Sequence, residues 1–351
     1  MAASAEVRVP CGGVFDETLA FFCDRLGFRV ERIHPADRPR LAVVTGSGVR
    51  LRLDANAEGA PPEIVIRATE SPALTAPNGS RIEFEPIEVP LTVPALEPDR
   101  IVTNGDDTGW TTGRAGMGYR DLLPGRLGGR FIASHIRIDA GGPVPDYVHY
   151  HRVRFQMIFV RRGWVRVVYE DQGEPFVMHA GDCVLQPPTV RHRVLESSPG
   201  LEVIEIGCPA EHETLADAAL ELPTDTVDPA RDFGGQRFLR HQADIALWVD
   251  SGLAGMEIRP FGLGAATDGL AEGLHLRAVE QRLLSIDPPD ELLFVYVLAG
   301  KATVDTRELA RDGCCVLPPN ATAELGLDAG CELLVVTLPA AMPDAYMTVT
   351  G

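Results

Sequence analysis

Basic residues are few in this chain relative to acidic ones. Lys and Arg total 32 against 50 Asp and Glu, which gives a net charge of −18 over 351 residues. A surface of this sign repels nucleic-acid phosphates and anionic lipids, so nucleic acid and membrane surfaces are excluded as expected partners. We therefore expect a small-molecule substrate, and we leave a homodimer open.

Cysteines are also few and show no disulfide pattern. The seven residues are odd in number and scattered, and most lie in apolar runs such as Asp182-Cys183-Val184-Leu185. This is typical of reduced, buried thiols. No apolar run reaches the roughly 18 residues that a membrane span needs, and the opening MAASAEVRVPCGG lacks the features of a secretory signal. We expect a cytoplasmic protein.

Turn-forming residues, by contrast, are abundant. The chain contains 35 Gly and 28 Pro, which favours many short strands joined by turns. A chain of this length is expected to form two or three domains. Composition and length together predict a mainly β protein with more than one domain.

The first 84 residues predict a small α+β domain with the order strand, helix and three strands. The expected elements span residues 6–9, 15–26, 28–32, 41–44 and 49–53. The helix and turn ETLAFFCDRLGF and the later segment PNGSRIEF resemble the vicinal-oxygen-chelate fold of glyoxalases and bleomycin-resistance proteins. The family's metal ligands are His and Glu residues, and only Glu83 matches one in position. The resemblance therefore implies a truncated accessory domain without a metal.

Two segments farther along the chain look alike. FQMIFVRRG (155–163) matches LLFVYVLAG (292–300), and GDCVLQP (181–187) matches GCCVLPP (313–319). Such self-similarity predicts a duplicated all-β unit. Stretches rich in Pro and acid suggest linkers, so we predict an α+β domain over 1–84, a linker over 85–103, a first barrel over 104–215, a linker over 216–235 and a second barrel over 236–351.

Three histidines form the clearest candidate site. His149 and His151 are two residues apart, so on a strand both rings lie on one face. A later strand that begins near His192 can bring a third imidazole to the same point. Imidazole suits Fe, Mn, Ni, Cu or Zn, and three such ligands leave positions open for a substrate.

The spacing around these histidines resembles the two motifs of the cupin superfamily. The match runs from His149 and His151 through position 156 to Gly163, and then from Gly181 through Pro187 to His192. The resemblance implies that His149, His151 and His192 are metal ligands inside a double-stranded β-helix barrel. It is imperfect at three positions, where the chain has Gln156 for Glu, Thr189 for Gly and Glu196 for Asn.

Gln156 is a candidate fourth ligand through its carbonyl oxygen. Alternatively, it hydrogen-bonds a metal-bound water. A Gln156→Glu change is expected to retain or tighten metal binding, because a carboxylate is the stronger ligand.

The second copy has none of the ligands. Alignment of the two copies places Ile286 and Pro288 at the His-x-His positions, Leu293 at Gln156 and Glu324 at His192. We therefore predict a bicupin with a metal in the first barrel only and a degenerate, metal-free second barrel. Bicupin dioxygenases of the quercetin- and gentisate-cleaving kind likewise keep their metal in one barrel. The expected fold class is mainly β, with two cupin-type barrels preceded by a small α+β domain.

Four further residues lie beside the ligand positions in the sequence. The candidate substrate-binding residues are Tyr147, Arg154, Gln186 and Arg191. An arginine among them would hold a carboxylate or enolate oxygen. Three other histidines, His135, His179 and His212, are interpreted as ordinary hydrogen-bonded residues.

The preferred functional hypothesis is an enzyme, a non-haem dioxygenase acting on a small aromatic or enolisable compound. It would hold one divalent transition metal, with Fe favoured over Mn, Ni, Cu and Zn, because neutral ligands leave room for substrate and dioxygen. Two alternatives stay open. One is a non-redox lyase or isomerase that uses the metal as a Lewis acid, and the other is a small-molecule sensor without turnover.

Overall fold

The chain is mainly β, as predicted. A computed structural model describes residues 4–69, 71–105 and 107–350. The chain divides into two compact units, Met1–Pro90 and Leu91–Gly351. Among the described helices, none has the length and apolarity to cross a membrane.

The first unit has the predicted strand, helix and three-strand order. Its four-stranded sheet, in the order β1-β4-β3-β2, contains β1 (Val7–Pro10), β2 (Arg29–His34), β3 (Leu41–Gly46) and β4 (Val49–Asp54). The helix α1 (Phe15–Ala20) continues as a π-helical turn over Phe21–Arg25. A second sheet, in the order β5-β7-β6, contains β5 (Glu63–Arg67), β6 (Leu74–Thr75) and β7 (Arg81–Glu85). The resemblance to the vicinal-oxygen-chelate fold stays a prediction.

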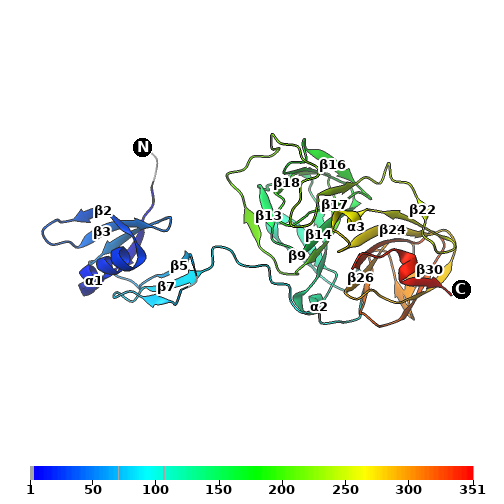
Figure 1. Ribbon diagram of the computed structural model, residues 1–351, viewed down its shortest axis with the longest axis horizontal. Helices are drawn as coiled ribbons and strands as arrows, with labels where there is room; N and C mark the ends of the chain where they lie inside the picture. Colours follow the sequence, from blue (N-terminus) through cyan, green and yellow to red (C-terminus); the bar gives the residue numbers. More distant parts are fainter. Residues whose placement is uncertain (1–3, 70, 106, 351) are drawn as a thin grey trace. The chain divides into compact units, whose positions relative to one another are not determined.

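The second unit contains two barrels, each made of two sheets (Figure 1). The larger sheet of the first barrel has the order β21-β17-β14-β19-β11-β10-β9. Its strands are β9 (Trp110–Thr112), β10 (Gly118–Asp121), β11 (Ile132–Ile138), β14 (Phe155–Arg162), β17 (Cys183–Leu185), β19 (Leu201–Cys208) and β21 (Leu239–His241). The short helix α2 (Arg126–Gly129) leads into β11.

The other sheet of the first barrel carries the histidines. It has the order β16-β15-β18-β13-β20, with β12 paired to β18. Its strands are β12 (Gly142–Pro143), β13 (His149–His151), β15 (Trp164–Tyr169), β16 (Phe176–His179), β18 (His192–Ser197) and β20 (Thr214–Ala216).

The second barrel repeats this plan. One sheet has the order β22-β23-β24-β31-β26-β29-β8, and the other the order β28-β27-β30-β25-β32. The strands are β8 (Ile101–Thr103), β22 (Val249–Asp250), β23 (Met256–Pro260), β24 (Glu272–Ala278), β25 (Arg282–Ile286), β26 (Leu292–Ala299), β27 (Ala302–Val304), β28 (Arg307–Leu309), β29 (Cys314–Leu317), β30 (Ala323–Leu327), β31 (Glu332–Leu338) and β32 (Met347–Val349), with the helix α3 (Leu263–Ala266) before β24.

The two barrels exchange edge strands. β21 lies in the range predicted for the second barrel but pairs with β17 of the first, and β8 ends the predicted linker but pairs with β29 of the second. The predicted residue boundaries therefore do not coincide with the sheet boundaries. A sequence pattern identifies a short apolar strand but not the sheet whose free edge it covers.

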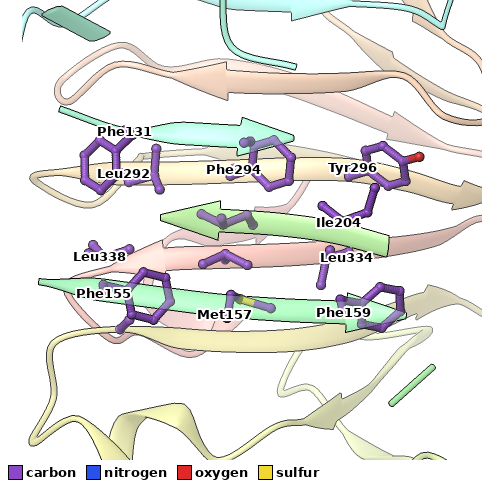
Figure 2. Close-up of a cluster of buried hydrophobic side chains, with 14 of the residues drawn as sticks. Phe131, Phe155, Met157, Phe159, Ile204, Leu292, Phe294, Tyr296, Leu334 and Leu338 are labelled. Carbon is purple, nitrogen blue, oxygen red and sulfur yellow. The ribbon is translucent and has the colours of Figure 1, made fainter. Parts of the chain in front are cut away.

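The barrels share a hydrophobic core. Figure 2 shows side chains of β14 and β19 packed among those of β26 and β31. On β14, Phe155, Met157 and Phe159 belong to this shared core. Because side chains alternate along a strand, Gln156 on the same strand faces the interior of the first barrel.

Candidate metal centre

The three predicted histidines meet inside the first barrel. His149 and His192 are directly opposite each other on β13 and β18, and His151 follows on β13. Their candidate ligand atoms all lie within 4.8 Å of one another. This is close to the separation of about 4.2 Å or less that two nitrogens bound to one ion have. In the described part of the chain, no other set of three or more His, Cys, Asp or Glu residues is so arranged.

Backbone carbonyl groups hold each imidazole in one tautomer. The Nδ1–H groups of His149, His151 and His192 donate to the carbonyl oxygens of Tyr147 (2.8 Å), Glu213 (3.3 Å) and Val190 (3.0 Å). Each Nε2 therefore carries the lone pair. Metal-binding histidines are typically held in this way by a partner on the second ring nitrogen. The donor set fits a divalent metal ion.

Burial keeps the imidazoles neutral. It lowers the pKa of His149, and it lowers the pKa of His192 well below the usual value for histidine. Burial, reinforced by His212 and His149, lowers the pKa of His151 to about 3. Neutral imidazole is the form that binds metal.

We expect the metal-free protein to lose stability as the pH falls below about 6.5, the ordinary pKa of histidine. Below this pH the histidines of the unfolded chain become protonated. The same histidines in the folded protein stay neutral until the pH reaches their own, lower pKa values, so protonation favours the unfolded state. Each such group costs up to about 1.4 kcal/mol per pH unit. Urea unfolding at about pH 7.5 and pH 5.5 measures this loss, which should be smaller in a His192→Leu variant. Equal losses in the two proteins would contradict the assignment.

Arg114 reaches the candidate metal centre from outside both histidine strands. Its Nη2 donates to the lone pair of His149 Nε2 at 3.1 Å, a hydrogen bond that an ion bound to this atom would displace, and its Nη1 donates to the buried carboxylate of Asp146. The other oxygen of Asp146 accepts the backbone N–H of Val194, on the strand of His192 (2.9 Å). Ala115, next to Arg114, has a left-handed φ of 55°, which a residue with a side chain adopts only at a cost. The tight turn thus holds a guanidinium beside a candidate ligand.

A cavity of about 440 Å³ extends from the histidines through the barrel. Its body is apolar and is lined by Ile136, Ile158, Val165, Met178 and Val203, among others. Its polar wall contains the three histidines, Arg114, Tyr119, Gln156, Tyr169, Gln186, Glu205, Glu211, His212 and Thr214. The cavity is thus large enough for a small organic molecule with an apolar body and a polar head.

Two buried amides in this wall have fixed partners. Gln156 Nε2 donates to Glu205 Oε1 at 2.6 Å, and Gln186 Nε2 donates to the hydroxyl of Tyr169 at 2.8 Å. Tyr169 also stacks on His192, with ring centroids 5.5 Å apart. These contacts hold the wall in one arrangement around the histidines.

Comparison with known proteins agrees with this geometry. Residues 134–206, which include all three histidines, match the family described as Cupin domain. The likeness to this family therefore covers the strands that carry the candidate site. No match was found among curated proteins.

Solved bicupin structures resemble both cupin barrels together. A Lactobacillus farciminis oxalate decarboxylase in complex with formate matches with a TM-score of 0.53 and 13% identity, over 74% of this chain and 89% of that one. A point mutant of Bacillus subtilis oxalate decarboxylase matches with a TM-score of 0.52 and 13% identity, over 72% of this chain and 79% of that one. At this identity the likeness establishes the bicupin fold and nothing finer.

Of the four predicted substrate-binding residues, only Gln186 is among the described residues that line the cavity of the first barrel. Arg154 instead pairs, together with Arg130, with Glu291 of the second barrel. Arg191 pairs with Asp217 and lies over the ring of Tyr150. Tyr147 is 46% exposed; its ring lies 5.8 Å from that of His149 but outside the cavity wall.

Sequence reasoning missed several residues of the site, among them Arg114, Asp146, Glu205 and His212. His212 was interpreted as an ordinary histidine, yet it lines the cavity with its ring 5.1 Å from that of His151. For Arg114 a signal was present, because GRAGM (113–117) recurs as GLAGM (252–256) with only this residue changed.

The second barrel shows which residues take the positions of the candidate site when no metal ligands are present. The register places Ile286 opposite Ala323, just as His149 lies opposite His192. Ala323 is therefore the counterpart of His192, and the alignment with Glu324 was wrong by one residue. Glu324 is exposed and on the other face of β30. The register and the GLAGM repeat give the counterparts of Arg114, Tyr119, His149, His151, Gln156, His192 and Glu205 as Leu253, Ile258, Ile286, Pro288, Leu293, Ala323 and Val335.

Strands β11 and β24, by contrast, both keep a polar pair on the face that points away from the barrel interior. His135 pairs with Glu202 beside Trp110, and His275 pairs with Glu332 beside Trp248. The duplication thus preserves this pair on the far side of the sheet, while the polar residues differ in the barrel interior. The difference between the two interiors is therefore specific to the candidate site.

Proposed function

We propose that this chain is a metal-dependent enzyme that acts on a small molecule inside the first cupin barrel. The observation that carries the proposal is the arrangement of three neutral imidazoles at one wall of an apolar cavity. Apolar residues take their places in the second barrel, so the fold itself does not require them.

The substrate we propose has an apolar body and one anionic oxygen, as in an enolate, a phenolate or a carboxylate. Ile, Val and Met side chains line the cavity body, whereas Arg114 is the arginine among its described lining residues. Since Asp146 already neutralises part of the charge of Arg114, a monoanion suits the site better than a dianion.

Dioxygen-dependent cleavage of such a compound is the preferred reaction, with Fe as the preferred ion. A bound ion would supply Lewis acidity and, if redox-active, electron transfer to dioxygen. The protein's part is to hold the ion on His149, His151 and His192, to orient the substrate oxygen with Arg114 and to exclude water with the apolar wall.

A non-redox lyase is the second candidate. A similar solved structure, with a TM-score of 0.50, is of Bacillus subtilis oxalate decarboxylase and its Mn(II) centres, which makes Mn a second candidate ion here. Oxalate itself is small and polar throughout, so the apolar cavity favours a larger substrate.

Elemental analysis of protein purified without added metal, combined with oxygen uptake, tests the proposal. We expect one divalent ion per chain and oxygen consumption with a β-diketone, a catechol or a flavonol. Metal without oxygen uptake would favour the lyase, and metal and ligand binding without any turnover would favour a sensor. Protein that binds no divalent ion would overturn the proposal.

For the first 84 residues we propose a truncated vicinal-oxygen-chelate module without a metal. The resemblance supports this, and Glu83, the single residue that matches a ligand position, pairs with Arg81 (2.6 Å). This unit is therefore proposed as an accessory domain.

A further inference from the structure

We propose that Glu205 is a positioning residue of the metal centre and acts through Gln156. It holds the amide of Gln156 so that the carbonyl oxygen becomes a fourth ligand, and it supplies the negative charge that the histidines lack. The inference rests on the proposed metal site.

The contact that carries the inference joins two strands of the larger sheet of the first barrel. Gln156 on β14 and Glu205 on β19 both face the interior, and Gln156 Nε2 donates to Glu205 Oε1 at 2.6 Å. This is short for an N–H···O bond, as expected with a charged acceptor. An amide that donates through Nε2 to one side presents Oε1 on the other. Gln156 is 2% exposed and lines the same cavity as the histidines.

Glu205 itself does not belong to the ligand cluster. The candidate ligand atoms that lie within 4.8 Å of one another belong to the three histidines. The carboxylate of Glu205 is not part of this group. Its carboxylate therefore reaches the centre through the amide. Hydrogen bonding of the amide N–H to a carboxylate increases the electron density on Oε1, which makes a neutral amide a better ligand for a cation.

The charge of the centre also calls for such a partner. The three imidazoles are neutral, and the carboxylate of Asp146 is already paired with Arg114. Glu205 is the cavity-wall carboxylate that balances a divalent ion; the other one, Glu211, is exposed. Removal of the charge of Glu205 should therefore weaken metal binding even though no direct ligand is lost.

The second barrel loses the pair as a unit. Leu293 takes the position of Gln156 and Val335 that of Glu205, and both are buried in its apolar interior. A hydrogen bond needed only to join β14 to β19 would have no reason to disappear together with the histidines. Its loss alongside them associates the pair with the metal centre.

Titration of the full-length, metal-free protein with Co(II), followed by visible absorption, tests the inference. Glu205→Gln should weaken Co(II) binding about 10–100-fold and change the Co(II) spectrum. Gln156→Leu should have the same two effects. The double variant Gln156→Glu with Glu205→Gln moves the charge to the other strand and should restore affinity to at least that of the wild type.

The single Gln156→Glu variant tests whether the metal affinity depends on both positions together. It places two carboxylates in contact, so its affinity should be lower than that of the double variant. Glu196→Gln, which removes one solvent-accessible carboxylate from the same barrel, is the matched control and should change affinity less than about 2-fold.

The outcomes separate this inference from the proposed function. Wild-type protein that fails to bind Co(II) would overturn both. Wild-type binding with unchanged affinity and spectrum in Glu205→Gln and Gln156→Leu would overturn the role of Glu205 alone. Thermal unfolding of each variant identifies a loss of fold, and restoration by the double variant cannot arise from a purely structural role.

Discussion

Replacement of His151 by Ala should remove the metal ion from the protein. His151 is 8% exposed, its Nδ1 is held by Glu213, and its Nε2 belongs to the cluster of candidate ligands. Two imidazoles and the neutral amide of Gln156 are a weaker ligand set than three imidazoles and the amide. The affinity for the metal ion should therefore fall by more than about 100-fold. Metal analysis after dialysis, with Zn(II) or Fe(II) titration of the metal-free variant, measures the loss.

His179→Ala is the matched control for this change. His179 lies on β16 of the same barrel but is exposed, and it is not part of the cluster. Its removal should leave metal content at the wild-type level. Wild-type metal content in His151→Ala would mean that the three histidines do not act as one site.

Replacement of Arg114 by Leu should abolish the preference for anions while metal binding survives. The change installs the residue that the second barrel has at the matching position of its own Gly-x-Ala-Gly-Met segment, Leu253. The two turns differ in backbone conformation, since Ala115 has a positive φ and Ala254 does not, so thermal unfolding of the variant is measured first to check that it folds. A hydrogen bond to a charged group contributes about 1.5–3 kcal/mol, so the affinity for an apolar carboxylate should fall about 10–100-fold.

Calorimetric titration of metal-loaded protein with benzoate and with neutral benzamide separates charge from packing. Only benzoate binding should weaken in Arg114→Leu. Arg166→Gln, which removes an exposed cation from the same barrel, should leave both ligands unaffected. Asp146→Asn should weaken benzoate binding less than Arg114→Leu, since the guanidinium remains but loses its anchor. Equal loss for benzoate and benzamide would show that Arg114 shapes the cavity and does not recognise charge.

Sequence patterns predicted the features that depend only on residues close together in the chain. Alternating apolar residues and Gly-bounded turns predicted the strands, and the spacing of His149 and His151 placed both rings on one face of β13. The duplication was visible because each copy must fill a similar apolar frame. The same reasoning failed by one residue at Ala323, because turn lengths between β29 and β30 differ from those of the first copy.

Residues beside a ligand in the sequence proved poor guides to the cavity. Arg154 and Arg191 flank the histidine motifs, yet alternation and the nearby carboxylates Glu291 and Asp217 direct both away from it. Arg114 and Glu205 lie 35 or more positions from His149 in the chain, and they reach the site from a turn and from β19, respectively. Proximity of this kind depends on strand order in the sheets, which no short motif encodes.

The sequence by itself therefore determined the β architecture, its duplication and the three histidines, since these follow from periodicity and short-range spacing. Only the tertiary structure decided which side chains complete the site, which sheet receives each edge strand, and which arginine faces the cavity. The physical reason is that strands far apart in the chain pair in the barrel, and a shift of one residue in that pairing turns a side chain from the interior to the outside.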